Sequence, residues 1–104
     1  MYNKTRKYNI ITLCGSIKFK DTFLKIQESL TLKGNIVFTP NFLSNIKKEE
    51  LSLDTKKMLD EMHKQKIDIS DEIYVINVNG YIGESTKHEI EYAKLKRKNI
   101  SYLE

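Results

Sequence analysis

The stretch Asp68-Ile-Ser-Asp-Glu-Ile-Tyr-Val-Ile-Asn-Val-Asn-Gly-Tyr-Ile-Gly-Glu-Ser-Thr-Lys-His-Glu-Ile-Glu-Tyr-Ala93 combines the patterns of a strand, a glycine loop and a helix. Residues 73–78 are β-branched or aromatic apart from Asn77, which is typical of a strand covered on both faces in a parallel sheet. Two glycines follow, and Ser85 or Thr86 can cap the next helix. The stretch therefore predicts a loop and a helix amino end at the carboxyl edge of a sheet, where α/β proteins bind ligands and where anionic groups are favoured.

The rest of the chain also alternates between strand and helix patterns. Apolar residues recur at helical spacing from Phe19 to Leu30, and Lys33-Gly34 is a usual helix ending. The expected order is strand 8–13, helix 19–33, strand 36–38, helix 55–69, strand 73–78, helix 86–97 and strand 100–103. With right-handed crossovers, this order predicts a three-layer, flavodoxin or Rossmann-like α/β fold with a four-stranded parallel sheet in the order 2-1-3-4.

The helix expected at 55–69 carries a histidine on its apolar side. The apolar positions expected in this helix are Met58, Leu59, Met62 and Ile69, and the row that begins at Leu59 continues through His63 and Ile67. His63 is therefore expected to face inward. A buried histidine of this kind is either a core residue or a catalytic one, and both interpretations stay open.

Length and composition indicate one folded domain, 1–104. The chain has 104 residues, of which 39% are hydrophobic and 31% are charged, and Cys14 is its only cysteine. No signal peptide or membrane span is expected, so the cytoplasm is the expected compartment. The net charge of +4 comes from scattered basic residues, which indicates a solvated surface rather than a nucleic-acid-binding face.

Two glycine loops, at residues 15–18 and 79–85, are expected to meet between the first and third strands and to line one pocket. The residues that could hold a phosphate there, through hydroxyls, backbone amides and one cation, are Ser16, Lys18, Gly83 and Ser85. Turn formation would explain the glycines equally well. Tyr81 could stack on a base. No metal-ligand spacing is present, and neither loop fits the Walker or dinucleotide fingerprints, so no metal or cofactor is expected.

Glu89 is the candidate carboxylate for chemistry, because it lies one turn into the helix that follows the second glycine loop. A structural interpretation competes with the catalytic one. Thr86-Lys-His-Glu89 is also a formal capping box, in which the glutamate accepts a hydrogen bond from the amide of the cap residue.

Three motifs, Leu-Cys-Gly-Ser-Ile-Lys18, Ile-Asp-Ile-Ser-Asp71 and Gly-Tyr-Ile-Gly-Glu-Ser-Thr-Lys-His-Glu-Ile-Glu-Tyr-Ala93, together resemble the nucleoside 2-deoxyribosyltransferase superfamily. This superfamily includes the 2'-deoxynucleoside 5'-phosphate N-hydrolases. Within it, the chain resembles the branch of short phage and bacterial proteins. The resemblance implies that Glu89 attacks C1' of a deoxyribose, expels the base and forms a glycosyl-enzyme ester. A second base, or water, then takes the sugar.

The resemblance also implies a substrate site and a partner. The implied positions of the 5'-phosphate are Ser16, Ile17, Lys18, Gly83 and Ser85, and Gly15 and Tyr81 complete the expected substrate-binding set. Thr12 stands where the family usually has a tyrosine, and His63 stands where it has an aspartate, so His63 is the candidate proton donor. A homodimer is expected, because the core is small and the family points the same way. Two functions are favoured: cleavage or exchange of the N-glycosidic bond of a 2'-deoxynucleoside or its 5'-monophosphate, and non-catalytic nucleotide binding. A nucleic-acid-binding or purely structural protein is the remaining alternative.

Overall fold

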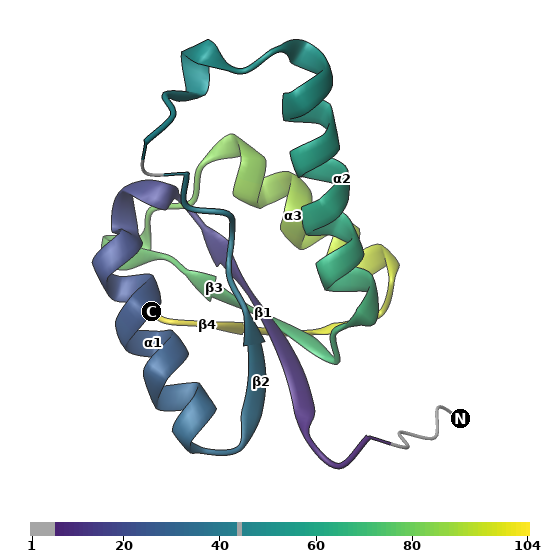
Figure 1. Cartoon of the computed structure of the whole chain (residues 1–104). Helices are drawn as coiled ribbons and strands as arrows, with labels where there is room; N and C mark the ends of the chain where they lie inside the picture. Colours follow the sequence, from purple (N-terminus) through teal and green to yellow (C-terminus); the bar gives the residue numbers. More distant parts are fainter. Residues whose placement is uncertain (1–5, 44) are drawn as a thin grey trace.

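The protein is described by a computed structural model that covers residues 6–43 and 45–104; residues 1–5 and 44 of the expected domain lie outside it. One parallel sheet has the strand order β2-β1-β3-β4 (Figure 1). Its strands are β1 (Asn9–Gly15), β2 (Asn35–Phe38), β3 (Glu72–Ile76) and β4 (Asn99–Tyr102). The main helices are α1 (Lys20–Leu32), α2 (Leu53–Ile69) and α3 (Glu84–Leu95). The predicted α/β class, four-stranded parallel sheet and strand order are confirmed.

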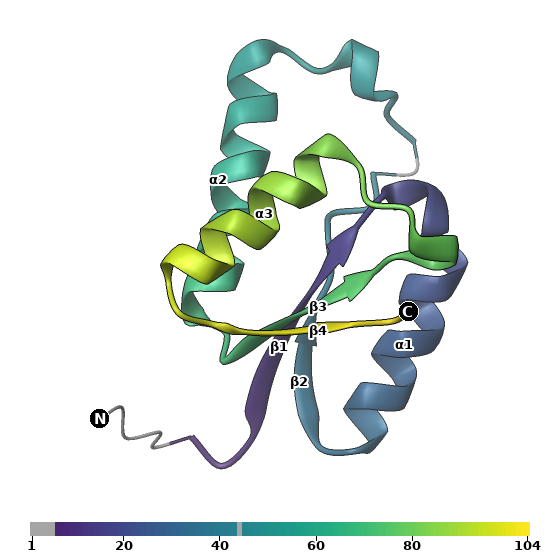
Figure 2. The same cartoon turned by 180° about the vertical axis from the view of Figure 1, so that it is seen from behind.

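The two central strands bury side chains in two apolar layers, one on each face of the sheet. Successive strand residues point to opposite faces, so β1 and β3 supply both layers. The layer that holds α2 and α3 contains Cys14, Ile67, Ile73, Val75, Ile90 and Ala93. The layer that holds α1 contains Ile11, Leu13, Phe23 and Ile76. Figure 2 shows α1 on one side of the sheet and α2 and α3 on the other.

Strand β3 is shorter than the sequence predicts. The chain turns after Ile76 rather than after Val78. A short 3-10 helix, η3 (Val78–Gly80), follows, with Asn79 in the left-handed region at φ 55°. The chain no longer pairs as a strand at the buried Asn77, and the Asn77 side chain bonds to the backbone of Glu104 instead. Its amide donates to the Glu104 carbonyl at 3.1 Å, and its side-chain oxygen accepts from the Glu104 amide at 2.9 Å.

Helix α2 packs against the sheet through one row of side chains, the row that begins at Leu59. His63 and Ile67 are buried and Leu59 is half-buried, which confirms that His63 faces inward. The other apolar positions that predict this helix, Met58, Met62 and Ile69, lie outside the packed row and are 49%, 41% and 55% exposed. A helix that packs through one i, i+4, i+8 row leaves the neighbouring rows outside.

No helix in the described part of the chain has both the length and the apolar character needed to cross a membrane.

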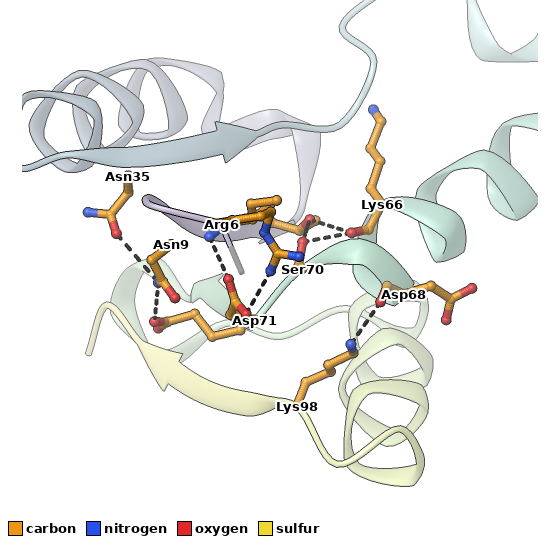
Figure 3. Close-up of polar contacts among 11 residues, drawn as sticks. Arg6, Asn9, Asn35, Lys66, Asp68, Ser70, Asp71 and Lys98 are labelled. Atoms are coloured by element: carbon orange, nitrogen blue, oxygen red, sulfur yellow. Dashed lines mark hydrogen bonds and ion pairs between the residues drawn. The ribbon is translucent and has the colours of Figure 1, made fainter. Parts of the chain in front are cut away.

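At the amino edge of the sheet, Asp71 ties β1 to β3 (Figure 3). The Ile10 amide donates to the Asp71 carboxylate at 2.8 Å, and the Asp71 amide donates to the Ile10 carbonyl at 2.8 Å. Arg6 adds an ion pair to the same carboxylate at 2.9 Å. These bonds come directly before the first registered pair, Ile11 with Glu72, so they help to set the register of the central strands.

We expect Asp71→Ala to lower the free energy of unfolding by about 1–3 kcal/mol, because the Ile10 amide loses its acceptor. Urea denaturation followed by circular dichroism measures the change. Asp60→Ala is the control, since Asp60 pairs with Lys64 at the surface and its loss should cost less than about 1 kcal/mol. Equal losses in the two variants would contradict this role of Asp71.

Candidate functional site

A cavity of about 260 Å³ lies at the carboxyl edge of the sheet. Its walls come from the segments that follow β1 and β2 and from α2 and α3. The apolar side chains that line it are Ile17, Leu43, Ile46, Leu51 and Leu59. The charged ones include Lys48, Lys56 and Asp60, together with Glu89 beside His63. An apolar hollow with a few convergent polar groups is the usual form of a small-molecule site.

Three side chains that are far apart in sequence meet beside this cavity. Cys14 comes from the end of β1, His63 from the middle of α2 and Glu89 from α3, and their ligand atoms all lie within 4.8 Å of one another. His63 Nε2 is 3.6 Å from Cys14 Sγ and 3.5 Å from Glu89 Oε1. The structure therefore brings the two predicted catalytic residues together and adds a thiol.

The capping-box interpretation of Glu89 is wrong. Helix α3 begins at Glu84, and its N-cap residue is Gly83, which has no side chain to form a cap. The Lys87 amide donates to the Gly83 carbonyl at 3.0 Å, so the helix starts before the expected caps, Ser85 and Thr86. Thr86 is inside the helix and only 3% exposed. The Glu89 carboxylate instead faces His63.

Cys14 was the functional candidate that sequence reasoning missed. Burial raises the pKa of its thiol well above the ordinary value, and the charge of Glu89 and a hydrogen bond to it raise the pKa further. The thiol is therefore protonated at neutral pH. A strand-period argument could have found it, because Cys14 is the last residue of β1 on the face that carries Thr12, next to the glycine loop.

The two glycine loops meet, and they do so through Lys18 and Tyr81. The Lys18 ammonium lies 3.6 Å from the centre of the Tyr81 ring, and the rings of Phe19 and Tyr81 pack edge to face at 5.9 Å. Of the predicted substrate-binding residues, Ile17 and Ser85 are among the described residues that line the cavity. The members that are not in that lining are Gly15, Ser16, Lys18, Tyr81 and Gly83.

Gly15 and Ser16 have structural roles that the sequence left open. A Cβ atom on Gly15 would lie 2.8 Å from the Ile76 carbonyl oxygen, so only glycine allows this approach of β1 to β3. The Ser16 hydroxyl accepts a hydrogen bond from the Lys18 amide at 3.3 Å and caps a 3-10 turn, η1 (Ile17–Phe19). Turn formation thus accounts for part of this loop.

The connection from β2 to α2 forms much of the cavity wall, and sequence reasoning placed no site residue there. Lys66 of α2 holds the start of this connection, since its ammonium donates to the Thr39 carbonyl at 2.8 Å and to Asn41 Oδ1 at 3.4 Å. Burial lowers the pKa of Lys66. The strand order could have indicated that this connection lines the site, because β2 ends at the same edge of the sheet as β1 and β3.

Thr12 is fully buried below this cluster and takes part in a hydrogen-bond group of its own. Its hydroxyl lies 2.6 Å from Ser70 Oγ and donates to the Lys66 carbonyl at 3.1 Å. These bonds join β1 to the end of α2, which gives Thr12 a structural role.

The fold is similar to that of two solved proteins. One is a 2-deoxyribosyltransferase of the psychrotolerant bacterium Bacillus psychrosaccharolyticus, with a TM-score of 0.70 and 18% identity over 89% of this chain and 70% of the other. The second is the CMP N-glycosidase BcmB of Clostridium botulinum, with a TM-score of 0.61 and 21% identity over 90% of this chain and 70% of the other. No protein-family model and no curated protein sequence matches the chain. At these identities the likeness is one of fold.

We expect Cys14 to react slowly with a chromogenic disulfide reagent in the folded protein. The side chain is buried, and its raised pKa leaves little of the reactive thiolate. Labelling should accelerate as the pH rises and should become fast when urea unfolds the chain. Fast, stoichiometric labelling of the folded protein at neutral pH would contradict the buried position of the thiol.

Proposed function

We propose that this chain cleaves or exchanges the N-glycosidic bond of a 2'-deoxynucleoside or its 5'-monophosphate, with Glu89 as the nucleophile. The observation that best supports the proposal is the position of Glu89. Its side chain is 15% exposed, lines the cavity and faces His63 rather than the helix cap. The names of the two similar solved proteins, a 2-deoxyribosyltransferase and a CMP N-glycosidase, agree with chemistry at this bond.

In the proposed reaction, the Glu89 carboxylate attacks C1' of the sugar while the C1'–N bond breaks and its electron pair leaves with the base. Covalent capture of an oxocarbenium-like centre divides one difficult displacement into two easier steps. The leaving base takes up a proton, and His63 is the proposed donor. Water or a second base then attacks C1', the ester bond breaks and the Glu89 carboxylate is restored.

His63 also positions Glu89 in this proposal, since its Nε2 atom lies 3.5 Å from the carboxylate. The amino end of α3 and the loop after β1 remain the proposed phosphate cradle, with Ser16, Ile17, Lys18, Gly83 and Ser85 as its residues and with Gly15 and Tyr81 beside the sugar or base. Lys48 and Lys56 also line the cavity and add two cations there, which would attract an anionic substrate.

A non-catalytic nucleotide-binding module is the second candidate function. The observation that favours it is Thr12, whose hydroxyl is engaged with Lys66 and Ser70 and so does not supply the phenol of the family tyrosine. Chromatographic screening of the common nucleosides, deoxynucleosides and their 5'-monophosphates for released base separates the two candidates. Tight nucleotide binding without base release would favour the module.

Replacing Glu89 by Gln tests the nucleophile directly, because the change removes the attacking charge and hardly alters the shape. We expect base release to fall by on the order of a thousandfold or more, equivalent to about 4 kcal/mol of transition-state stabilisation, with the fold retained. Glu91→Gln is the matched control, since Glu91 is exposed on the same helix and pairs with Lys94. An unchanged rate in a folded Glu89→Gln protein would remove Glu89 as the nucleophile.

We also infer that the chain forms a homodimer. Apolar side chains lie exposed along α2, namely Leu53, Met58, Met62 and Ile69, and a partner would cover them. Light scattering at micromolar concentration should then give twice the 12.2 kDa mass of one chain. A mass equal to that of one chain would contradict the inference.

A further inference from the structure

We propose that Cys14, His63 and Glu89 together bind one Zn²⁺ ion, or a similar thiophilic divalent cation, with a fourth coordination position open to the cavity. This proposal goes beyond glycosidic-bond chemistry, because the ion could bind whether or not the protein carries out the proposed reaction. The three candidate ligand atoms already lie within 4.8 Å of one another.

Two of the three spacings between these atoms match those of ligands around a tetrahedral ion. With a Zn–S bond of about 2.3 Å and Zn–N and Zn–O bonds of about 2.0 Å, the sulfur and nitrogen lie about 3.5 Å apart and the nitrogen and oxygen about 3.3 Å apart. In this protein, His63 Nε2 is 3.6 Å from Cys14 Sγ and 3.5 Å from Glu89 Oε1. The third pair, Cys14 Sγ and the Glu89 carboxylate, lies within 4.8 Å, and side-chain movement would bring it to the spacing of about 3.5 Å around a tetrahedral ion.

A cation would also interact with all three side chains at once, which hydrogen bonds from His63 cannot do. His63 Nε2 has either one hydrogen or one lone pair, yet it is the atom that faces both Cys14 and Glu89. It can make one strong hydrogen bond and not two. An ion between the three atoms would accept a lone pair from each of them.

The donor set favours a thiophilic ion over a hard one. A thiolate, a neutral imidazole and a carboxylate suit Zn²⁺ or Co²⁺, whereas Mg²⁺ and Ca²⁺ prefer sites built from oxygen ligands. The thiolate and the carboxylate would together balance the two positive charges of the ion. Cys14 is protonated without a cation, so binding would release its proton to solvent.

Rigid elements hold the three ligands, which reduces the ordering that binding would require. Cys14 belongs to the central strand β1, and His63 and Glu89 belong to two helices packed on that face of the sheet. His63 and Glu89 line the cavity, whereas Cys14 is buried behind them. Three protein ligands with one position open to a cavity is the arrangement of a zinc site that can exchange water or ligand.

Binding of the ion would also control the proposed reaction, and this consequence rests on the proposed function. A carboxylate coordinated to a cation is a much weaker nucleophile toward C1', because the ion draws electron density from both of its oxygens. The metal-bound protein and the glycosyl-transferring protein would then be mutually exclusive states of one site.

Titration of the untagged protein with Co²⁺ tests the site, because a cobalt–thiolate bond gives a charge-transfer band in the near ultraviolet. We expect one band that saturates at one equivalent, that Zn²⁺ abolishes by displacement, and that excess Mg²⁺ leaves unchanged. Cys14→Ser should remove the band, and His63→Ala should weaken binding by on the order of a hundredfold or more. The matched control is His88→Ala, since His88 is the other histidine of the chain and is exposed on α3.

Absence of the band in the wild-type protein would overturn the proposal, and so would undiminished affinity in a folded His63→Ala protein. If Cys14→Ser does not fold, the His63→Ala and His88→Ala pair still decides. Saturating Zn²⁺ should stop base release, and a chelator should restore it. Base release that persists with Zn²⁺ bound would refute the mutual exclusion, whereas Zn²⁺ binding by a protein that releases no base even when it is metal-free would refute only the proposed function.

Discussion

The parallel pairing of β1 with β3 is the constraint on which the rest of the structure depends. Their register runs from Ile11 with Glu72 to Gly15 with Ile76, and it places the ends of both strands at one edge. The chain leaves β1 toward β2 on one side and leaves β3 toward β4 on the other, so the strand order reverses between them. Such a reversal opens a crevice at the carboxyl edge of a sheet, and the cavity of this protein lies at that edge.

The same pairing determines which polar groups are buried together. Because β1 continues to Gly15 beside β3, Cys14 points into the layer under α2 and α3. His63 and Glu89 reach it from those two helices, and the cluster is mostly shielded from water. Burial disfavours the charged thiolate and the nearby Glu89 charge adds to this, which together explain the raised pKa of Cys14. Electrostatic interactions are also stronger in such surroundings, which is why both proposals place a positive charge beside this cluster.

The two proposals concern the same carboxylate in two chemical states. In the first proposal Glu89 would be a free nucleophile, whereas in the second an ion would draw electron density from it and weaken its attack on C1'. His63 Nε2 lies 3.5 Å from Glu89 and would serve in both states, as a hydrogen-bond donor to Glu89 in the first and as a neutral ligand in the second. A cavity wall built from the β2–α2 connection and held by Lys66 would then serve whichever ligand occupies the site.

The sequence by itself determined the elements, the strand order and the inward orientation of His63, because periodicity and turn residues depend on near neighbours. It also placed Glu89 at the correct edge of the sheet. Only the tertiary structure decided that Glu89 faces His63 rather than a helix cap, that one row of α2 is buried, and that Cys14 joins the cluster. Cys14 and His63 are 49 residues apart, so no local pattern records their contact. Their meeting follows from the packing of β1, α2 and α3, which only the whole fold specifies.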